Sequence, residues 1–186
     1  VFFTNYFNAV LPTHNSLFSS WCGIFPEISD NFVRENLTYT LGLKCFPDVL
    51  NSLGYTQNFF FGHGSWYGGI KQFLKNHSYQ KVVDLEEITK KFPKLAKNKH
   101  ELGIHDTNLS RYTIRQLDKL VNMQPFNLGV FYINTHVPFF TASDCPKYNE
   151  SSKHLQAIHC VDFAVGMVLR IIKEKGLMKN TVVVLV

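Results

Sequence analysis

The chain lacks several patterns that would place it quickly in a functional class. No apolar run in the sequence approaches the roughly 18 residues that a membrane-spanning helix needs. The four cysteines form no C-x-x-C pair, which argues against a zinc site. Neither the Walker pattern nor G-x-G-x-x-G occurs, and no segment of the sequence repeats. These absences exclude a repeat array and leave a nucleotide-binding protein poorly supported.

Positive charge is concentrated in one part of the chain. Nineteen Lys and Arg against 14 Asp and Glu give a net charge of +5. A nucleic-acid site is expected to show a basic stripe interleaved with aromatic residues, whereas much of the excess here lies in a lysine run around the helix-breaking Pro93. The run consists of Lys90, Lys91, Lys94, Lys97 and Lys99. We therefore predict a solvated lysine-rich insertion at about residues 86–102 and no nucleic-acid partner.

Length and composition predict one globular domain. With 186 residues and 45% hydrophobic content, the chain can bury a sizeable core. It opens inside an apolar segment at Val1, without a Met, and closes in the apolar run 182–186. We expect residues 1–186 to be part of a single domain within a longer protein.

The number of cysteines and the glycosylation motifs favour an extracytoplasmic setting. The cysteines are even in number, as in disulfide-bonded proteins, although the sequence leaves their pairing open. Asn-x-Ser/Thr motifs occur at Asn36, Asn76, Asn108 and Asn149. We expect a glycoprotein that is secreted, lumenal or a membrane-anchored ectodomain.

Segments typical of strands alternate with segments typical of helices. Apolar runs rich in β-branched or aromatic residues predict strands at residues 1–11, 55–61, 81–85, 127–134 and 181–186. Apolar residues at helical spacing predict helices at residues 17–22, 47–53, 70–74, 109–121 and 155–172. This alternation predicts an α/β fold, a doubly wound and mostly parallel sheet with helices on both faces.

The last predicted helix has the clearest periodicity. Its apolar residues recur at helical spacing, at Leu155, Ile158, Val165, Leu169 and Ile172. Asp162 falls on the same stripe, and a carboxylate that faces a core needs a hydrogen-bonding partner. We predict that Asp162 is a structural, hydrogen-bonded residue and that Gly176 ends the helix.

Thr13 stands where the first predicted strand meets the first predicted helix. Free backbone N–H groups and the positive end of the helix dipole stabilise a phosphate or sulfate ester there, or an ionising hydroxyl. This placement favours Thr13 as the nucleophile of a group-transfer reaction. The alternative is that Thr13, Asn15 or Ser16 only caps the helix, which is the common role of these residue types.

Two later segments are candidates for substrate contact. The glycine-rich segment 62–69 contains Trp66 and follows a predicted strand, and His136 follows another. Because ligands bind at the carboxyl edge of open parallel sheets, both segments are expected at that edge. The isolated His14, His63 and His105 are read as surface residues and not as metal ligands.

The order of these segments resembles the sulfatase family of the alkaline phosphatase superfamily. The family's strand, nucleophile turn and helix are similar to Phe3-Thr4-Asn5-Tyr6 followed by residues 12–16 (PTHNS) and 22–26 (CGIFP). Residues 47–56 (PDVLNSLGYT) resemble the segment before the second core strand. Residues 159–184 resemble the helix and strand that lead into the family's metal motif. The resemblance covers nearly the whole chain.

The resemblance places Thr13 where sulfatases carry the cysteine that becomes formylglycine. Classical sulfatases have Pro two residues later and Arg four residues later, where this chain has Asn15 and Leu17. Because threonine cannot be oxidised to formylglycine, the chain looks closest to the branch of lipoteichoic acid synthases and phosphoethanolamine transferases, which use a threonine. That branch implies Thr13 as nucleophile and metal ligand, with Trp66 and His136 binding the substrate.

The resemblance also implies a cofactor and a substrate class. A divalent metal ion, Mn, Mg, Ca or Zn, is expected in the full-length protein, with its other ligands outside this chain. The implied function is metal-dependent hydrolysis or transfer of phosphate or sulfate esters on an anionic lipid head group or glycan. The alternative is a catalytically inactive domain that binds a glycan or an anionic head group. The isolated chain is expected to be inactive, and any membrane association is expected to come from segments outside it.

Two cysteine pairs are candidate disulfides within this arrangement. Cys22 and Cys45 flank the segment after the nucleophile helix, so a bond between them would hold that segment in place. Cys145 and Cys160 are the second candidate pair.

Overall fold

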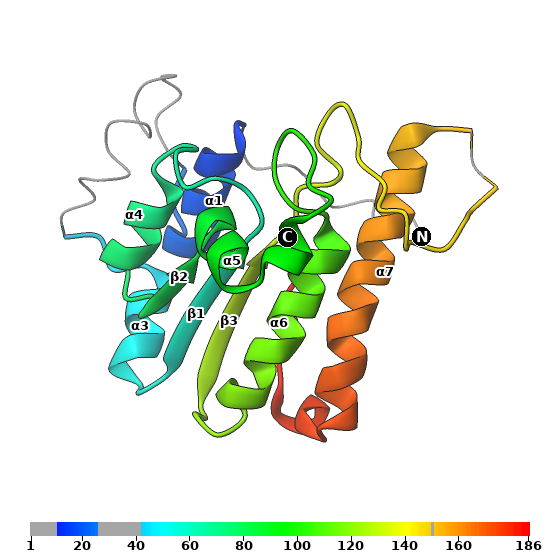
Figure 1. Ribbon diagram of the computed structural model, residues 1–186. Helices are drawn as coiled ribbons and strands as arrows, with labels where there is room; N and C mark the ends of the chain where they lie inside the picture. Colours follow the sequence, from blue (N-terminus) through cyan, green and yellow to red (C-terminus); the bar gives the residue numbers. More distant parts are fainter. Residues whose placement is uncertain (1–10, 26–41, 150) are drawn as a thin grey trace, which may run out of the picture.

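A parallel three-stranded sheet forms the centre of the structure. The computed structural model describes residues 11–25, 42–149 and 151–186. Within them, β1 (Thr56–Phe61) lies between β2 (Lys81–Val83) and β3 (Phe126–Phe131). Helices lie on both faces of this sheet (Figure 1). The predicted doubly wound, parallel α/β fold is therefore confirmed.

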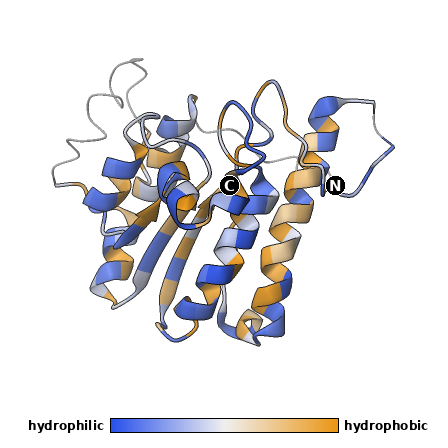
Figure 2. Cartoon of the chain, viewed as in Figure 1, coloured by the Kyte–Doolittle hydropathy of each residue, from blue (hydrophilic) through white to orange (hydrophobic). Residues whose placement is uncertain are grey.

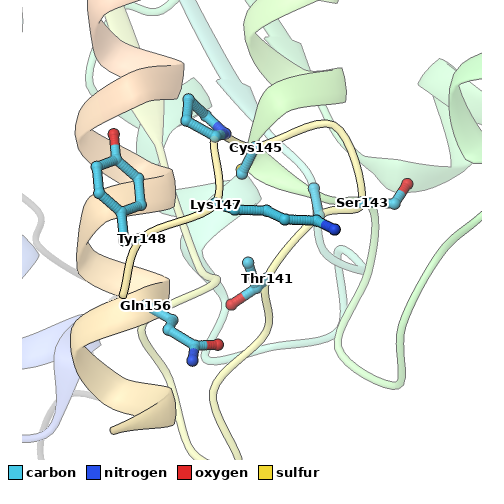
Figure 3. Close-up of a pocket in the computed structure, with 8 residues that line it drawn as sticks. Thr141, Ser143, Cys145, Lys147, Tyr148 and Gln156 are labelled. Carbon is cyan, nitrogen blue, oxygen red and sulfur yellow. The ribbon is translucent and has the colours of Figure 1, made fainter. Parts of the chain in front are cut away.

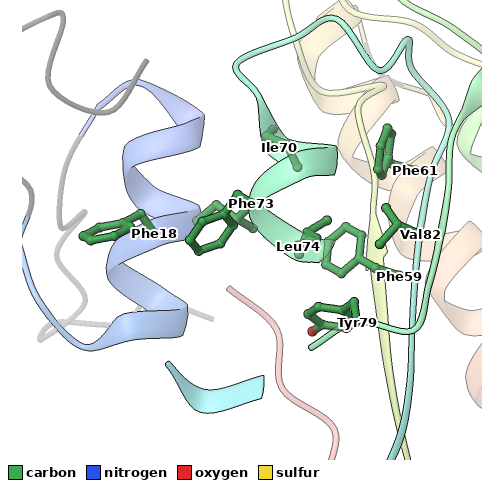
Figure 4. Close-up of a cluster of buried hydrophobic side chains, with 9 residues drawn as sticks. Phe18, Phe59, Phe61, Ile70, Phe73, Leu74, Tyr79 and Val82 are labelled. Atoms are coloured by element: carbon green, nitrogen blue, oxygen red, sulfur yellow. The ribbon is translucent and has the colours of Figure 1, made fainter. Parts of the chain in front are cut away.

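One face of the sheet is covered by α1 (Thr13–Cys22) and α4 (Ile70–Asn76). Because successive side chains of a strand point to opposite faces, Phe59 and Phe61 pack against these helices while Phe60 packs on the other side. The resulting cluster is rich in aromatic rings (Figure 4). It consists of Leu17, Phe18, Phe59, Phe61, Ile70, Phe73, Leu74, Tyr79 and Val82.

The opposite face is covered by α5 (Leu85–Lys91) and α6 (Asp106–Leu120). There the ring of Phe60 meets Tyr112 edge-on, with the ring centroids 5.1 Å apart. The long α7 (Lys153–Glu174) lies along α6, where Ser110 Oγ donates to the Ala164 carbonyl at 2.8 Å. The short α3 (Phe46–Ser52) precedes β1, and the short 3-10 helix η2 (Leu177–Asn180) follows Gly176.

The face that α7 buries differs from the predicted one. The buried residues are Ala157, Cys160, Ala164, Val168 and Ile172. Leu155 and Ile158 are 43% and 41% exposed, and Asp162 is exposed. The prediction of a core-facing Asp162 is therefore wrong, because the small residues of α7 are the ones that let it approach α6 closely. By length and composition alone α7 could cross a membrane, and apolar colour runs along much of it in Figure 2.

The lysine-rich segment is folded and is not a solvated loop. Residues 86–102 include most of α5 and the 3-10 helix η1 (Pro93–Ala96). Their lysines point to solvent, but Ile88, Leu95 and Ala96 are buried against the cluster around Phe60. The prediction of a solvated loop was wrong because it considered the lysines and not the apolar residues that recur at helical spacing between them.

The predicted strand at residues 181–186 is not part of this sheet. These residues have no regular secondary structure, and the side chains of residues 182–186 are exposed, with Val182 at 88%. A strand needs a neighbour that accepts and donates its backbone hydrogen bonds. In the described sheet β3 is one of the two edge strands, and residues 181–186 do not pair with it. Residues 1–10, which make up almost all of the first predicted strand, lie outside the described residues.

Candidate functional site

One edge of the sheet holds the three residues singled out from the sequence. The strands are parallel, so their carboxyl ends point to the same edge. Residues 62–69, with Trp66, follow β1, and residues 132–149, with His136, follow β3. The N-terminus of α1, where Thr13 lies, is at this edge too (Figure 1).

Thr13 is the first residue of α1. The N-cap position is occupied by Pro12, which has no capping side chain, so the interpretation of Thr13, Asn15 or Ser16 as the N-cap is wrong. The first backbone bonds of the helix run from Asn15 N and Ser16 N to the Pro12 carbonyl, at 2.9 and 3.2 Å. The N–H group of Thr13 precedes these bonds, so it is oriented to donate to an anion.

The loop after β1 packs on this helix end. The rings of His14 and Tyr67 meet edge-on, with their centroids 6.2 Å apart. Gly68 has φ of +58°, and a Cβ there would lie 3.3 Å from His14 Cβ, so a larger residue would be strained and crowded. The close contact between Gly68 and His14 brings the loop to the residue next to Thr13.

Trp66 lies at the surface of the same loop. Its side chain is 77% exposed, and it folds back so closely that a Cβ at Gly64 would lie 2.3 Å from Trp66 Nε1. Its ring centroid is 6.1 Å from that of Tyr67. An exposed indole beside a helix N-terminus can stack on a ligand that the helix end binds.

His63 is a buried residue at the end of β1, contrary to its interpretation as a surface histidine. Its ring stacks on Phe61 at 4.6 Å and meets Phe131 edge-on at 5.2 Å. Burial lowers the pKa of His63, so the ring is neutral at neutral pH. His14, at 8% exposure, is also buried, and the surface interpretation is wrong for both because aromatic neighbours from distant segments cover them.

His136 lies in an exposed turn whose start is held by the N-terminus of α6. The Asp106 carboxylate accepts hydrogen bonds from Ile133 N at 3.0 Å and from Asn134 N at 2.9 Å. Asp106 is fully buried, and this burial raises its pKa to about 6. The turn is closed by a bond from Phe140 N to the Asn134 carbonyl at 2.8 Å.

Two histidines complete the support of this turn. Leu102 N donates to His100 Nδ1, so the proton is on Nε2, which donates to Asn134 Oδ1 at 3.1 Å. The His100 ring stacks on Phe140 at 3.8 Å. Burial, with the adjacent His105, lowers the pKa of His100 to about 4. His105 is half-buried and lies within 3.4 Å of the Asn134 amide.

The part of the chain that the structure describes does not form a metal site around Thr13. Within it, the only group of three His, Cys, Asp or Glu side chains close enough to share an ion is Cys22, Cys45 and His77. The structure joins Cys22 to Cys45 and also joins Cys145 to Cys160 in disulfides, so these sulfurs are not thiolate ligands. A metal at Thr13 would need ligands from outside the described residues.

The structure brings together only part of the predicted site. The loop that carries Trp66 contacts the residue beside Thr13, whereas the hydrogen bonds of His136 within the described residues are to its own turn. Sequence reasoning missed Asp106 and Asn134, which hold the His136 turn. The available signal was a carboxylate at a predicted helix start and an amide at the end of a buried strand.

Sequence comparison relates the chain to known proteins. The profile of the family described as Sulfatase matches residues 1–186. Phosphoglycerol transferase I of Escherichia fergusonii is 26% identical over 175 residues, which make up 89% of this chain and 23% of that protein. The chain therefore spans about a quarter of the length of this curated relative.

Two solved structures share the fold. The lipoteichoic acid synthase LtaP from Listeria monocytogenes superposes with a TM-score of 0.78 at 16% identity, covering 94% of this chain and 43% of that one. A protein in the alkaline phosphatase superfamily from Vibrio parahaemolyticus superposes with a TM-score of 0.71 at 18% identity, covering 85% and 38%. At these identities the structures are evidence for the fold alone.

Proposed function

Because the chain belongs to the sulfatase family, we propose that the protein hydrolyses or transfers phosphate or sulfate esters with Thr13 as its nucleophile. The observation that carries this proposal is the position of Thr13 at the start of α1. The backbone N–H group of Thr13 lies ahead of the first hydrogen bonds of the helix there. Such groups stabilise the charge of a bound ester and of the transition state.

The proposed reaction has two steps at Thr13. In the first, Thr13 Oγ1 bonds to the phosphorus of the donor and loses its proton, while the ester bond to the leaving group breaks and the departing oxygen takes up a proton. In the second, a water or an acceptor hydroxyl attacks the same phosphorus. The Oγ1–P bond breaks, and Thr13 regains a proton. Hydrolysis and transfer differ only in which hydroxyl attacks.

We propose a phosphoglycerol-type head group as the donor, because phosphoglycerol transferase I aligns with 89% of the chain. In this proposal the exposed indole of Trp66 would cover a head group bound at the start of α1. His136, exposed on its turn, would donate to a phosphoryl oxygen. The substrate class is therefore an anionic ester of a lipid head group or a glycan, which fits an extracytoplasmic location for a domain with two disulfides.

A divalent metal ion is part of the proposal for the full-length protein. When bound, it would neutralise charge on the ester and lower the pKa of the Thr13 hydroxyl. Of the residues described, only Thr13 belongs to the ligand set implied by the resemblance, so the isolated chain is proposed to be inactive.

The second candidate function is a non-catalytic domain that binds a glycan or an anionic head group. Asn15 and Leu17 take the places of the proline and arginine of classical sulfatases, and both are buried. Leu17 belongs to the apolar cluster under β1, so this position supplies no cation to a substrate. This loss favours binding without turnover.

The test uses full-length protein, with phosphatidylglycerol vesicles as donor. Thr13→Ala should lower turnover about a thousandfold or more, and Thr13→Ser should keep measurable activity. Mass spectrometry of the Thr13 peptide should detect a phosphoglycerol adduct in the wild type alone. Thr89→Ala, a matched change at an exposed position of α5, should leave turnover unchanged. Turnover that survives Thr13→Ala would remove Thr13 from the mechanism, and absence of turnover in the wild type would favour the binding domain.

A further inference from the structure

An open pocket lies beside the turn that carries His136. Its volume is about 400 Å³, within the range of roughly 300 to 1,000 Å³ that is usual for small-ligand sites. Residues 141–143 and 145–148 form most of its wall, and Gln156 of α7 forms the rest (Figure 3). The residues that matter for its chemistry are Thr141, Ser143, Lys147 and Tyr148.

The wall of this pocket is tied to two helices. The disulfide between Cys145 and Cys160 joins it to α7. Asp144 accepts hydrogen bonds from Thr107 at 3.0 Å and from Arg111 at 2.5 Å, which join the wall to α6. These ties hold the pocket in one shape before a ligand binds, which reduces the entropy lost on binding.

The polar groups of the pocket suit a sugar. Tyr148 is 39% exposed, and its ring is held by stacking on His159 with the centroids 4.1 Å apart. A supported aromatic ring can pack on the apolar face of a pyranose. Thr141 and Ser143 supply hydroxyls, and such groups can exchange hydrogen bonds with sugar hydroxyls.

The charge of the pocket favours an anion. Figure 3 shows the Lys147 side chain running across the pocket toward Ser143. Asp144, between the lining residues Ser143 and Cys145, does not line the pocket and is paired with Arg111. Within the described part of the chain, Lys147 has no carboxylate within ion-pair distance, so its ammonium group can pair with an anion on the ligand.

We propose that this pocket binds the sugar unit of an anionic glycan and is the acceptor subsite of the transfer reaction. The proposal rests on the proposed function for its catalytic role. It is supported by position along the chain, because the pocket wall begins at Thr141, directly after the turn of His136. A hydroxyl of the bound sugar would take the place of water in the second step.

The first test measures binding without catalysis. Full-length Thr13→Ala protein is titrated by calorimetry with sulfated lactose and, for comparison, with lactose. The sulfated sugar should bind about tenfold more tightly, and adding Lys147→Ala should remove that difference. Adding Tyr148→Ala should weaken both sugars. The control Lys173→Ala, an exposed lysine in the last turn of α7, should change neither.

Equal binding of the two sugars, or an unchanged preference in Lys147→Ala, would overturn the proposal.

The second test measures transfer to a sulfated glycan acceptor, where Lys147→Ala should raise the acceptor KM about tenfold and Lys173→Ala should not. An unchanged KM would overturn the assignment as acceptor subsite. Failure of the proposed function is distinguishable, because the wild type would then release no head group from the donor while sugar binding persisted.

Discussion

Replacing Gly129 with alanine should destabilise the centre of the sheet. Gly129 in β3 lies opposite Phe59 in β1, and an added Cβ would lie 2.2 Å from Phe59 Cδ2 and 2.4 Å from Cε2. The Phe59 ring is 1% exposed and is held between Trp21 and Tyr79, with centroids 5.8 and 5.4 Å away. Because the ring has nowhere to move, we expect a cost of about 3 kcal/mol, the upper end for overpacking.

The matched control is the same substitution in a helix. A Cβ at Gly166 in α7 would meet no atom within 4 Å. Alanine has the higher helix propensity, so Gly166→Ala should stabilise the protein by about 0.5 to 1 kcal/mol. Urea denaturation followed by circular dichroism compares the two variants with the wild type. Shifts of equal sign, or no loss of stability in Gly129→Ala, would refute the packing argument.

A second substitution tests the cause of the loss. Phe59→Leu removes the ring that an alanine at position 129 would meet, so Gly129→Ala should cost at least about 1 kcal/mol less in that background. The double-mutant cycle gives this difference directly. Strict additivity would show that Gly129 matters for a reason other than its contact with Phe59.

Asp84→Ala should lower the free energy of unfolding by about 2 to 4 kcal/mol, because it removes the cap of α5 and the buried partner of Lys71. Asp118→Ala, which removes an exposed ion pair, should cost less than about 1 kcal/mol in the same denaturation assay, and equal losses would contradict this ranking. Burial lowers the pKa of His100 from 6.5 to about 4, so the contribution of the neutral ring is complete above pH 6.5 and is lost as the pH falls toward 4. The free energy of unfolding of the wild type minus that of His100→Gln should therefore decrease by about 1 to 2 kcal/mol from pH 7 to pH 4. This range allows for solvent screening of a half-buried ring. A difference between the two proteins that does not change with pH would refute the prediction.

Local pattern in the sequence determined most of the secondary structure. Apolar runs alternate with segments in which apolar residues recur at helical spacing, and this alternation predicts β1, β2, β3 and the helices between them. The periodicity of each element is visible in its own residues, regardless of what the element packs against. Thr13 at a helix start follows in the same way, from the strand-like segment before it and the apolar spacing after it. These features depend on neighbours within a few residues.

Tertiary structure alone decided which surfaces are covered. The period of α7 is visible in the sequence, but only packing on α6 shows that Ala164 is buried and Asp162 exposed. Asp106 and Asn134 are 28 residues apart and meet only because α6 begins beside the end of β3. Burial of His63 likewise depends on Phe131, from another strand. Periodicity reports the shape of one element, whereas burial, pKa and the support of the His136 turn depend on contacts between elements distant in sequence.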